Sequence, residues 1–422
     1  MSSTTAVSGV RDHDDQGRPR LIDMVRQLEP EIRAIEREMD ERREVPQELT
    51  DALYDMGVYR SWLPAELGGL EVDLIEWLEC IEEAARINGS IGWLCMLHRG
   101  DTSIPAVTMR KILEQGRWIT AGNLGRAAGK AVKVEGGYRV SGRWPFSSGA
   151  PEATWFFGRS VLHGEDGEPV IDPRNGMPLT MVPYFPASDV ILHDTWDGLG
   201  LRATGSGDFE VIDAFVPDEL MDESGFHSRP YDGPLYRGRF FQLGQGAHTL
   251  GMARAAIDAF IDLAHQSARR GSYRQARLGR EQVHQLALAK ADSMVRAGRA
   301  FLWEIAEAGY EQAKHQEVLD FELRVRIHQA NAFAVSLARK AVQLVFEQAG
   351  SPTVYRGHAL ERIHRDMETG AQHALVAESS LDRVGQYLIS RDLPGGPEIE
   401  LGGIGFILGP YPQNERSAES GR

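Results

Sequence analysis

The stretch Tyr138-Arg-Val-Ser-Gly-Arg-Trp-Pro-Phe-Ser-Ser-Gly149 changes character along its length. Alternating apolar and polar residues predict a strand that turns at Gly142. Two aromatic rings and two hydroxyl groups then come within a few residues. A flat aromatic ligand is bound by apolar walls and one or two aimed hydrogen-bond donors. The stretch is therefore either a ligand-contacting loop or an ordinary strand end with a serine turn.

Composition indicates a soluble globular protein with two or three domains. The 422 residues are 42% hydrophobic and 25% charged, as in ordinary folded chains of this length. The formal net charge of −15 argues against nucleic acid or an anionic membrane as a partner. No apolar run is long enough for a membrane span, and the polar N-terminus lacks a signal-peptide core. We therefore expect a cytoplasmic protein, with Cys80 and Cys95 as buried free thiols.

The period of the hydrophobic pattern divides the chain into three folded parts, which predict an α+β protein that is mainly α. Helical periodicity opens the chain, β-rich runs with turn residues come next, and helical periodicity returns. The expected divisions are a disordered tail (1–19), an N-terminal helical domain (20–128), a central antiparallel β domain (129–235), a C-terminal four-helix bundle (236–391) and a C-terminal tail (392–422).

Individual segments can be placed within these parts. Apolar residues from Leu21 to Met39 recur every three or four positions and predict one helix. The central runs predict an antiparallel sheet or a small barrel. The bundle rests on four long helical segments, which are expected at 250–264, 283–308, 321–348 and 373–388.

Several common catalytic motifs are absent from the sequence. There is no Walker loop, no Gly-x-Gly-x-x-Gly between a strand and a helix, and no Gly-x-Ser-x-Gly elbow. These absences argue against a P-loop nucleotidase, a nicotinamide dehydrogenase of the Rossmann type and an α/β hydrolase. No Cys or His cluster has zinc-like spacing, so no metal site is expected.

The segment Gly200-Leu-Arg-Ala-Thr-Gly-Ser-Gly207 is a second candidate loop. It combines two positions that favour positive φ with the hydroxyls of Thr204 and Ser206. Such a loop can present backbone N–H and hydroxyl groups to an anion or to the edge of a flavin. A hairpin connection inside the β domain is the alternative.

Four further side chains each have an ordinary and a functional interpretation. His373 can shuttle a proton near neutral pH, but it is one of 13 histidines. His98 comes after an apolar helical segment, where the helix dipole favours a histidine. Trp93 fits the wall of a ligand site or the core. Arg269 closes a helix, where it compensates the dipole or binds a cofactor phosphate.

Taken in order, these pieces resemble the acyl-CoA dehydrogenase fold over roughly residues 20–390. That fold has an N-terminal helical domain, a central β domain and a C-terminal four-helix bundle. The resemblance is carried by Pro46…Gly57 with Leu63-Pro-Ala-Glu-Leu-Gly-Gly69, Tyr138-Arg-Val-Ser-Gly142, Gly200 to Asp208 with Val216-Pro217, and Arg365-Asp366.

The sequence departs from the dehydrogenases of that fold at the catalytic base. Those enzymes need a carboxylate to remove a proton next to a thioester. The two positions at which the resemblance places a glutamate are occupied by Ala374 and Arg270. The usual Arg-x-x-Phe-Gly cofactor motif is also replaced, by Arg269-Arg-Gly-Ser. Desaturation chemistry therefore has no obvious proton acceptor.

The replacements are similar to the flavin-dependent monooxygenases of this fold, the two-component (group D) hydroxylases. The shared features are Trp144-x-Phe-Ser-Ser-Gly149, Ser90-x-Gly-Trp93 and a histidine, His373, after Arg-Asp. The resemblance implies that a separate NAD(P)H-dependent reductase supplies reduced FMN or FAD. A flavin C4a-hydroperoxide, formed with O2, then hydroxylates an aromatic or polycyclic small molecule.

The resemblance also implies roles for individual residues. Ser148, or failing that Ser147, faces flavin N5, while His373 acts on the peroxide or the substrate and His98 binds substrate. A site that shields the flavin ring from water suits this chemistry. The expected cofactor-binding residues are Trp93, Asn123, Trp144, Phe146, Ser147, Ser148, Thr204, Ser206, Arg269 and Ser351.

Two other activities stay open on the sequence. One is an acyl-CoA dehydrogenase whose base lies elsewhere, and the other is an N-oxygenase that acts on an amine or amino sugar. A homotetramer is the family expectation, and the apolar segment at 330–346 is compatible with an interface or a buried bundle helix.

Overall fold

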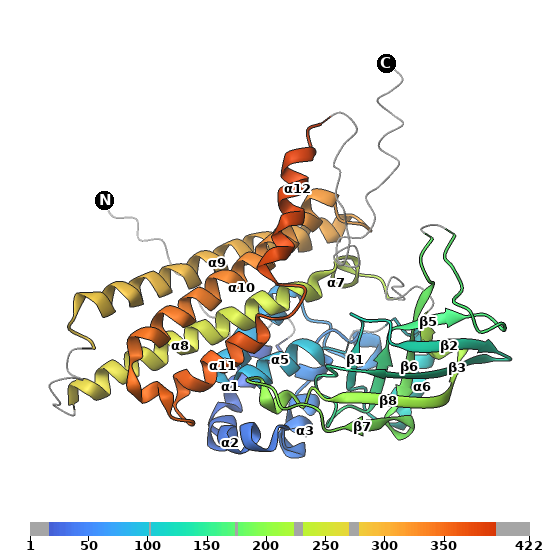
Figure 1. Cartoon of the computed structure of the whole chain (residues 1–422), viewed down its shortest axis with the longest axis horizontal. Helices are drawn as coiled ribbons and strands as arrows, with labels where there is room; N and C mark the ends of the chain where they lie inside the picture. The colour runs from blue at the N-terminus through green and yellow to red at the C-terminus, as the bar shows by residue number, and fades with distance from the viewer. Residues whose placement is uncertain (1–16, 101–102, 174–175, 223–230, 270–277, 394–422) are drawn as a thin grey trace.

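The computed structural model describes residues 17–100, 103–173, 176–222, 231–269 and 278–393. Nearly all of the two predicted tails lies outside these residues. Helices and a sheet form two bodies side by side, with the long helices on one side and the strands on the other (Figure 1). The first helices, within residues 21–55, lie beneath the long helices in this view.

The described residues of the N-terminal helical part form six α-helices. The predicted single helix from Leu21 to Met39 is wrong, because the helix breaks at Leu28 ahead of Pro30. Proline has no N–H and so cannot continue the hydrogen-bond ladder of the preceding turn. The helices are α1 (Leu21–Gln27), α2 (Glu29–Arg42), α3 (Gln47–Asp55), α4 (Leu74–Ile87), α5 (Gly89–Leu97) and α6 (Ala106–Gln115).

The β part is a single sheet in the order β1-β4-β6-β5-β2-β3-β8-β7, with β9 paired to β6. The predicted antiparallel sheet is only partly correct, because β1 pairs with β4 and β2 with β5 in parallel. The sheet also starts before residue 129. The strands are β1 (Thr120–Asn123), β2 (Gly129–Val134), β3 (Gly137–Trp144), β4 (Trp155–Gly158), β5 (Ser160–His163), β6 (Thr180–Pro186), β7 (Ile191–His193), β8 (Asp208–Pro217) and β9 (Met221–Asp222).

Gly142 does not turn the chain as the sequence predicts. Strand β3 continues to Trp144, and its pairing with β8 shifts register between Val140 and Gly142. Between these pairs β3 advances two residues and β8 three, so the extra residue lies on β8, where Asp213 has a positive φ of 51°. Such an extra residue bends the strand that carries it. A side chain at Gly142 would collide with the backbone of Gly129 on β2. Glycine is therefore required here by close strand packing, and the true turn comes after Trp144.

The C-terminal part is organised around helix α8, which contacts α4, α9, α10 and α11. The helices are α7 (Pro234–Arg237), α8 (Leu243–Arg269), α9 (Gln282–His315), α10 (Phe321–Ala349), α11 (Ala359–Gly370) and α12 (Asp382–Ser390). The fourth predicted segment, 373–388, is only partly correct, because α12 covers its end and not its beginning. Residues 371–377 form no helix, since Ala371 and Val376 pack against Val335 of α10 in a small apolar cluster.

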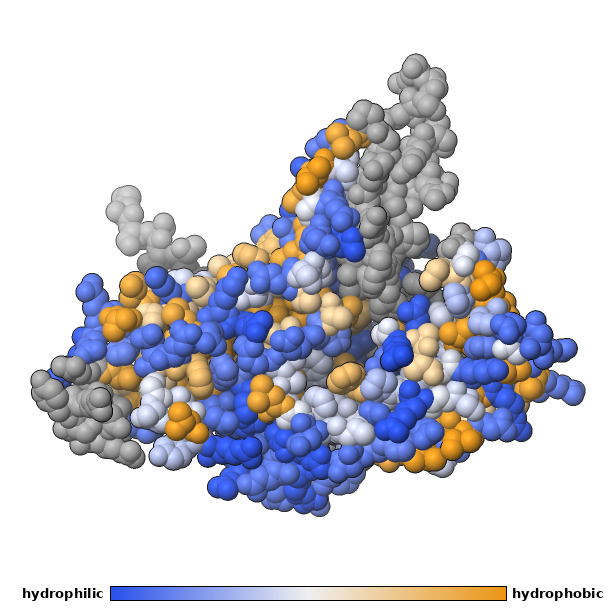
Figure 2. Space-filling view, viewed as in Figure 1, coloured by the Kyte–Doolittle hydropathy of each residue, from blue (hydrophilic) through white to orange (hydrophobic). Residues whose placement is uncertain are grey.

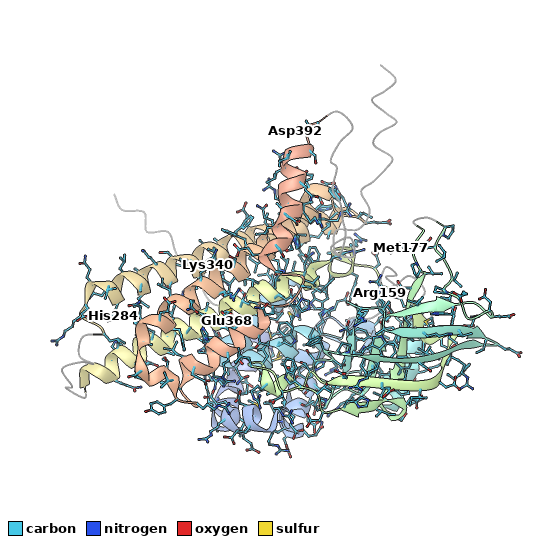
Figure 3. The ribbon with its side chains drawn as sticks, viewed as in Figure 1. Arg159, Met177, His284, Lys340, Glu368 and Asp392 are labelled. Carbon is cyan, nitrogen blue, oxygen red and sulfur yellow. The ribbon has the colours of Figure 1, made fainter. Side chains whose placement is uncertain are left out.

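Two large apolar cores stabilise the two bodies. One joins the N-terminal helices to the bundle, and the other lies within the sheet around Trp144, Phe156 and Phe209. Figure 3 shows side chains filling the region between the sheet, which carries Arg159, and the helices, which carry Glu368. No helix within the described ranges has the length and apolarity needed to span a membrane.

Apolar side chains also remain exposed on the outer strands of the sheet. Ile191 and Leu192 of β7 and Ile212 and Phe215 of β8 are exposed. Figure 2 shows orange atoms at the lower right of the molecule, where Figure 1 places β7 and β8. Ile191 and Leu192 are neighbours in one strand and so point to opposite faces of the sheet.

The junction between sheet and bundle tests the fold directly. A Cβ at Gly200 would overlap the backbone of Arg365 in α11. We expect Gly200→Ala to lower the free energy of unfolding by about 1–3 kcal/mol, the usual cost of overpacking. Gly385→Ala in α12 is the matched control, since no atom lies within 4 Å of its added Cβ. Urea unfolding followed by circular dichroism measures both, and equal effects would contradict this packing.

Candidate functional site

Two loops of the β part meet at the end of β3. The N–H of Ser147 donates to Gly207 O at 3.0 Å, and the N–H of Gly149 donates to Thr204 O at 2.7 Å. Phe146 and Leu201 adopt positive φ values of 59° and 49°, which are uncommon for residues with a side chain. These backbone bonds hold both loops in conformations that neither would keep alone. The stretch 145–149 and the loop 200–207 therefore form one unit.

Three hydroxyls and one indole form a line through this unit. Trp93 of α5 donates its Nε1–H to Ser148 Oγ at 3.2 Å. Ser148 Oγ lies 2.7 Å from Ser206 Oγ, which lies 2.6 Å from Thr204 Oγ1. Thr204 in turn donates to Leu201 O at 2.7 Å. The structure thus brings together four of the residues predicted from sequence.

The two serines of the 138–149 stretch have different surroundings. Ser147 is fully buried, and its Oγ has no hydrogen-bond partner among the described residues. Ser148 keeps part of its surface accessible while it holds two hydrogen-bond partners. A ligand can therefore reach Ser148 and not the hydroxyl of Ser147. Of the two candidates for contact with a flavin edge, the geometry favours Ser148.

Trp144 and Phe146 do not pair up as two walls of one pocket. Trp144 is fully buried, stacks on Phe209 at 4.8 Å between ring centroids, and donates Nε1–H to Arg159 O at 2.8 Å. The prediction that Trp144 walls a ligand is corrected, because its ring belongs to the sheet core. Phe146 is 66% exposed and contacts Trp196 edge-on. Its ring is free to meet a ligand at the loop tip.

Asn123 fixes the loop from the side of β1. Its Nδ2 donates to Pro145 O at 2.6 Å, and its Oδ1 accepts from the N–H of Gly125 at 2.8 Å. Both ends of the amide are therefore engaged in local structure. Asn123 orients the start of the 145–149 stretch rather than presenting a free amide.

His98 is expected from the sequence to bind substrate, and the structure corrects this. Its ring is buried, with Nδ1 3.1 Å from Thr120 O and Nε2 3.0 Å from Glu152 Oε1. Glu152 Oε2 accepts from Thr50 Oγ1 at 2.5 Å. Both ring nitrogens are thus used inside the protein. A side chain at Gly149 would collide with this ring, so His98 supports the turn after Ser148.

His373 lies in the turn after α11 and faces the same place as Trp93. The two ring centroids are 5.9 Å apart. Its Nδ1 accepts from the N–H of Leu375 at 3.3 Å, which leaves the proton of the neutral ring on Nε2. The residue as a whole is exposed to solvent, whereas the protein packed around its ring lowers the pKa of His373 below the ordinary value. His373 is therefore a neutral hydrogen-bond donor at neutral pH.

A second histidine, His248 on α8, lies behind Trp93 and was missed by the sequence reasoning. Its ring contacts that of Trp93 at 5.3 Å, and its Nε2 donates to Gly89 O at 2.8 Å. Full burial lowers the pKa of His248 to about 4. One weak signal was present, a histidine among small residues in Gly244-Gln-Gly-Ala-His-Thr-Leu-Gly251. Small residues allow close helix packing, and that packing buries the ring.

The Arg-Asp pair of α11 anchors the second loop. Asp366 accepts the N–H of Leu201 at 2.6 Å, and Thr369 Oγ1 accepts the N–H of Gly200 at 2.8 Å. Arg365 donates to Leu199 O at 2.9 Å. Burial raises the pKa of Asp366 to about 6. The carboxyl group is engaged in structure, so it does not replace the catalytic base that the sequence lacks at Ala374.

Two predicted cofactor residues lie far from Ser148 within one chain. Arg269 ends α8, 21 positions after His248, and its helix rises about 1.5 Å per residue, or roughly 30 Å in all. Ser351 precedes α11, whereas His373 comes after that 12-residue helix, so about 18 Å of helix separates them. The described chain does not bring either residue to the Ser148 site.

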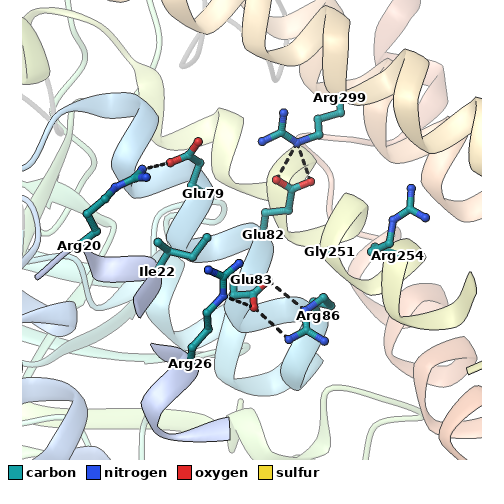
Figure 4. A pocket seen from close by; sticks show the side chains of 10 residues that line it. All are labelled: Arg20, Ile22, Arg26, Glu79, Glu82, Glu83, Arg86, Gly251, Arg254 and Arg299. Atoms are coloured by element: carbon teal, nitrogen blue, oxygen red, sulfur yellow. Dashed lines mark hydrogen bonds and ion pairs between the residues drawn. The ribbon is translucent and has the colours of Figure 1, made fainter. Parts of the chain in front are cut away.

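A recess of about 340 Å³ opens elsewhere, between α1, α4, α8 and α9 (Figure 4). Apart from Ile22 and Gly251, its walls are charged, and its arginines pair with carboxylates. It lacks the apolar walls that bind a flat ring. The pairs shown in the figure include Arg20–Glu79, Arg26–Glu83, Arg86–Glu83 and Arg299–Glu82. This recess is an ion-pair network between the N-terminal helices and the bundle.

Metal chemistry has no support in the described residues. No group of three His, Cys, Asp or Glu side chains there is placed to hold a metal ion. The two cysteines, Cys80 and Cys95, are buried and free, as predicted. Burial raises the pKa of both thiols, which keeps them protonated and unreactive.

Two family models match the chain. The N-terminal domain of acyl-CoA dehydrogenases matches residues 18–108, and the C-terminal domain matches residues 243–378. This chain belongs to the acyl-CoA dehydrogenase family. The match confirms the predicted fold. It covers both helical parts of this family member, and the sheet lies between the two matched ranges.

Curated relatives within the family are monooxygenases. Indole-3-acetate monooxygenase of Pseudomonas putida is 27% identical over 369 residues, which are 85% of this chain and 91% of that protein. HsaA of Rhodococcus jostii, a flavin-dependent monooxygenase oxygenase subunit, is 28% identical over 367 residues, 82% of this chain and 92% of that protein. These relatives confirm that the family member described here is an oxidoreductase enzyme.

Solved structures share the fold. The 3-HSA hydroxylase of Rhodococcus sp. RHA1 has a TM-score of 0.79 at 24% identity, covering 90% of this chain and 98% of that one. XiaF of Streptomyces sp., with FADH2 and glycerol, has a TM-score of 0.77 at 24% identity, covering 85% and 92%. KijD3 with FMN and dTDP-3-amino-2,3,6-trideoxy-4-keto-3-methyl-D-glucose has a TM-score of 0.68 at 23% identity, covering 89% and 95%.

The burial of His248 predicts a pH dependence of stability. The unfolded chain takes up a proton at this histidine near pH 6.5, whereas the folded chain does so only near pH 4. As the pH falls from 6.5 to 4, wild type should lose about 1.4 kcal/mol per pH unit relative to His248→Gln.

Comparing wild type with His248→Gln removes the contribution of Asp366, which changes stability with pH in the opposite direction. Asp366, with its pKa raised from 3.8 to about 6, favours the folded state at low pH and loses that contribution as the pH rises between these values. Because both proteins carry Asp366, it cancels in the difference. Urea unfolding at several pH values gives that difference, and a flat line from pH 6.5 to 4 would contradict the neutral, buried state of His248.

Proposed function

We propose that this protein is the oxygenase component of a two-component, flavin-dependent monooxygenase that hydroxylates an aromatic or polycyclic small molecule. The observation that carries the proposal is the partly accessible Ser148, whose hydroxyl accepts from the Trp93 indole, together with His373, whose ring packs against the same indole. A dehydrogenase of this family requires a carboxylate at the base position, and Ala374 stands beside His373 instead.

The residues present fit a flavin. Its ring needs an apolar wall, a partner for N5 and exclusion of water. Trp93 and Phe146 supply aromatic surface, and Ser148 supplies the polar contact. Bound reduced flavin supplies the electrons that activate O2, through the C4a-hydroperoxide known in this class of enzyme. Trp93, His248 and Leu201 bury the inner side of the site and keep water away.

His373 has a defined part in this proposal. Its ring is neutral, its Nδ1 is engaged with the backbone of Leu375, and its Nε2–H is a donor. A ring with a lowered pKa is a weak base, so it is poorly suited to deprotonating a phenol. We infer that His373 would donate a hydrogen bond to the activated oxygen or to the substrate, and that it does not remove a proton.

The choice of flavin and the partners are also part of the proposal. Related folds have been solved with FADH2 and with FMN, and we propose reduced FMN first, with FAD as the alternative. The designation of HsaA as an oxygenase subunit supports a separate NAD(P)H-dependent reductase. We also propose a homotetramer, in which Arg269 and Ser351 would contact the flavin of a neighbouring copy. A cytoplasmic location stays a prediction.

One alternative has a specific observation in its favour. The KijD3 structure contains FMN together with an amino sugar nucleotide, which supports oxidation at nitrogen as the second candidate. Mass spectrometry of the product decides between hydroxylation at carbon and at nitrogen. The dehydrogenase alternative predicts bleaching of bound oxidised FAD by an acyl thioester, which the monooxygenase does not.

The proposed activity is tested by rapid mixing. The protein is loaded anaerobically with reduced FMN and mixed with oxygenated buffer. We expect a transient oxygen adduct, with absorbance distinct from that of oxidised flavin, that outlives the adduct of free flavin. Immediate appearance of oxidised FMN with both FMN and FAD would contradict the proposal.

The two serines of the loop can be separated by the same measurement. We expect Ser148→Ala to shorten the lifetime of the adduct by about tenfold, because one hydrogen bond at N5 is worth about 1–1.5 kcal/mol. Ser147→Ala removes a hydroxyl that is buried away from the site and should shorten the lifetime much less. The reverse order of the two variants would assign N5 contact to Ser147.

A further inference from the structure

The hydrogen bonds around Ser148 have a fixed direction that is set by donor capacity alone. A hydroxyl group carries one proton and two acceptor lone pairs, an indole N–H only donates, and a carbonyl oxygen only accepts. The line of groups from Trp93 to Leu201 begins with an indole and ends with a carbonyl. The direction in which each of the three hydroxyls donates its proton can therefore be assigned in turn, starting at the carbonyl end.

The assignment starts at Thr204. Its Oγ1 lies 2.7 Å from Leu201 O, and two oxygens at this distance need a proton between them, which only Thr204 can supply. Thr204 then has no proton left for Ser206, so the 2.6 Å contact between them requires Ser206 to donate. Ser206 has in turn no proton for Ser148, and Ser148 must donate across 2.7 Å.

The proton of Ser148 is therefore directed away from the accessible side of the site. One lone pair of its Oγ accepts the Nε1–H of Trp93 at 3.2 Å. The second lone pair of Ser148 Oγ remains available to accept a hydrogen bond from a ligand. Ser206 and Thr204 are buried behind Ser148, so a ligand meets a serine that can accept a hydrogen bond and has none to give.

We propose that Ser206 and Thr204 are positioning residues that make Ser148 a hydrogen-bond acceptor and thereby select the reduced flavin. The inference rests on the proposed function, in which the flavin edge lies against Ser148. Reduced flavin carries a proton on N5, which Ser148 accepts. Oxidised flavin presents a bare N5 lone pair, so two acceptors face each other. The sequence suggests cofactor contact for both Ser206 and Thr204. In the structure, Ser206 lies one hydrogen bond behind Ser148 and Thr204 lies two hydrogen bonds behind it.

Breaking the chain at either residue should release the Ser148 proton. In Ser206→Ala the acceptor of that proton is gone, and Ser148 can turn and donate to oxidised N5. In Thr204→Val the proton of Ser206 has lost its acceptor, so Ser206 can donate to Ser148 instead. Thr204→Ser keeps the hydroxyl and should preserve the original direction. Ser206→Ala and Thr204→Val should each change the preference between redox states more than the total affinity.

The test measures binding and not turnover. Dissociation constants of reduced and oxidised FMN are determined anaerobically for wild type, Ser206→Ala, Thr204→Val and Thr204→Ser. We expect wild type to prefer reduced FMN. Ser206→Ala and Thr204→Val should reduce that preference by about tenfold, which is the worth of one hydrogen bond. Tenfold corresponds to about 30 mV in the two-electron potential of the bound flavin. Thr204→Ser should keep the wild-type ratio.

A matched control is available in the sheet. Ser160 on β5 is buried, and its Oγ donates to Gly158 O at 3.0 Å. Ser160→Ala therefore also removes one buried hydroxyl, and it should leave the ratio of dissociation constants as in wild type. Circular dichroism checks that each variant is folded. Ser206→Ala and Thr204→Val interrupt the line of hydrogen bonds independently, so either one carries the test if the other does not fold.

The outcomes separate this inference from the proposed function. If wild type binds neither form of FMN or FAD, the flavin function is overturned and the inference falls with it. If wild type prefers reduced FMN and both chain-breaking variants keep that preference, the directional chain alone is overturned. If Ser160→Ala lowers the preference for reduced over oxidised FMN as much as Ser206→Ala does, the effect is a general loss of packing. That result also overturns the directional chain.

Discussion

The site depends on one buried hydrogen bond between the sheet and the bundle, from the N–H of Leu201 to Asp366 Oδ1 at 2.6 Å. Leu201 has a positive φ, a conformation that costs free energy for a residue with a side chain. Asp366 offsets that cost, with Arg365 and Thr369 holding the adjacent residues of the loop. Because the loop is fixed at this end, Thr204 and Ser206 lie directly behind Ser148.

The electrostatics of the site are those of neutral donors and acceptors. His248 is buried with its pKa lowered to about 4, and the pKa of His373 is also lowered, so both rings are uncharged at neutral pH. Asp366 and Glu152, the carboxyl groups that border the site, are engaged with Leu201 and His98. Such a site is suited to holding a neutral ring in a dry environment and poorly suited to removing a proton from substrate.

Local sequence patterns correctly predicted the helices whose tertiary contacts agree with their own hydrophobic period. The helical segment expected at 321–348 is helix α10, Phe321–Ala349. The failures occur where tertiary contacts override the pattern. Apolar residues after Gly370 keep a helical period, yet Ala371 and Val376 pack on α10 instead. Trp144 belongs to a motif with aromatic and hydroxyl groups, yet β3 continues past Gly142 and its alternation points the ring into the sheet core.

Three features are already set by the amino-acid sequence: the order of the three parts, the loss of the carboxylate at Ala374 and the presence of hydroxyl groups in two loops. These are properties of residue identity and spacing, which the chain carries without folding. Folding settles which serine is accessible, that His98 is occupied by Glu152, and that His248 lies behind Trp93. These depend on contacts between residues far apart in the chain. The direction of the hydrogen bonds at Ser148 is decided there too, because it is set by a carbonyl group more than 50 residues away.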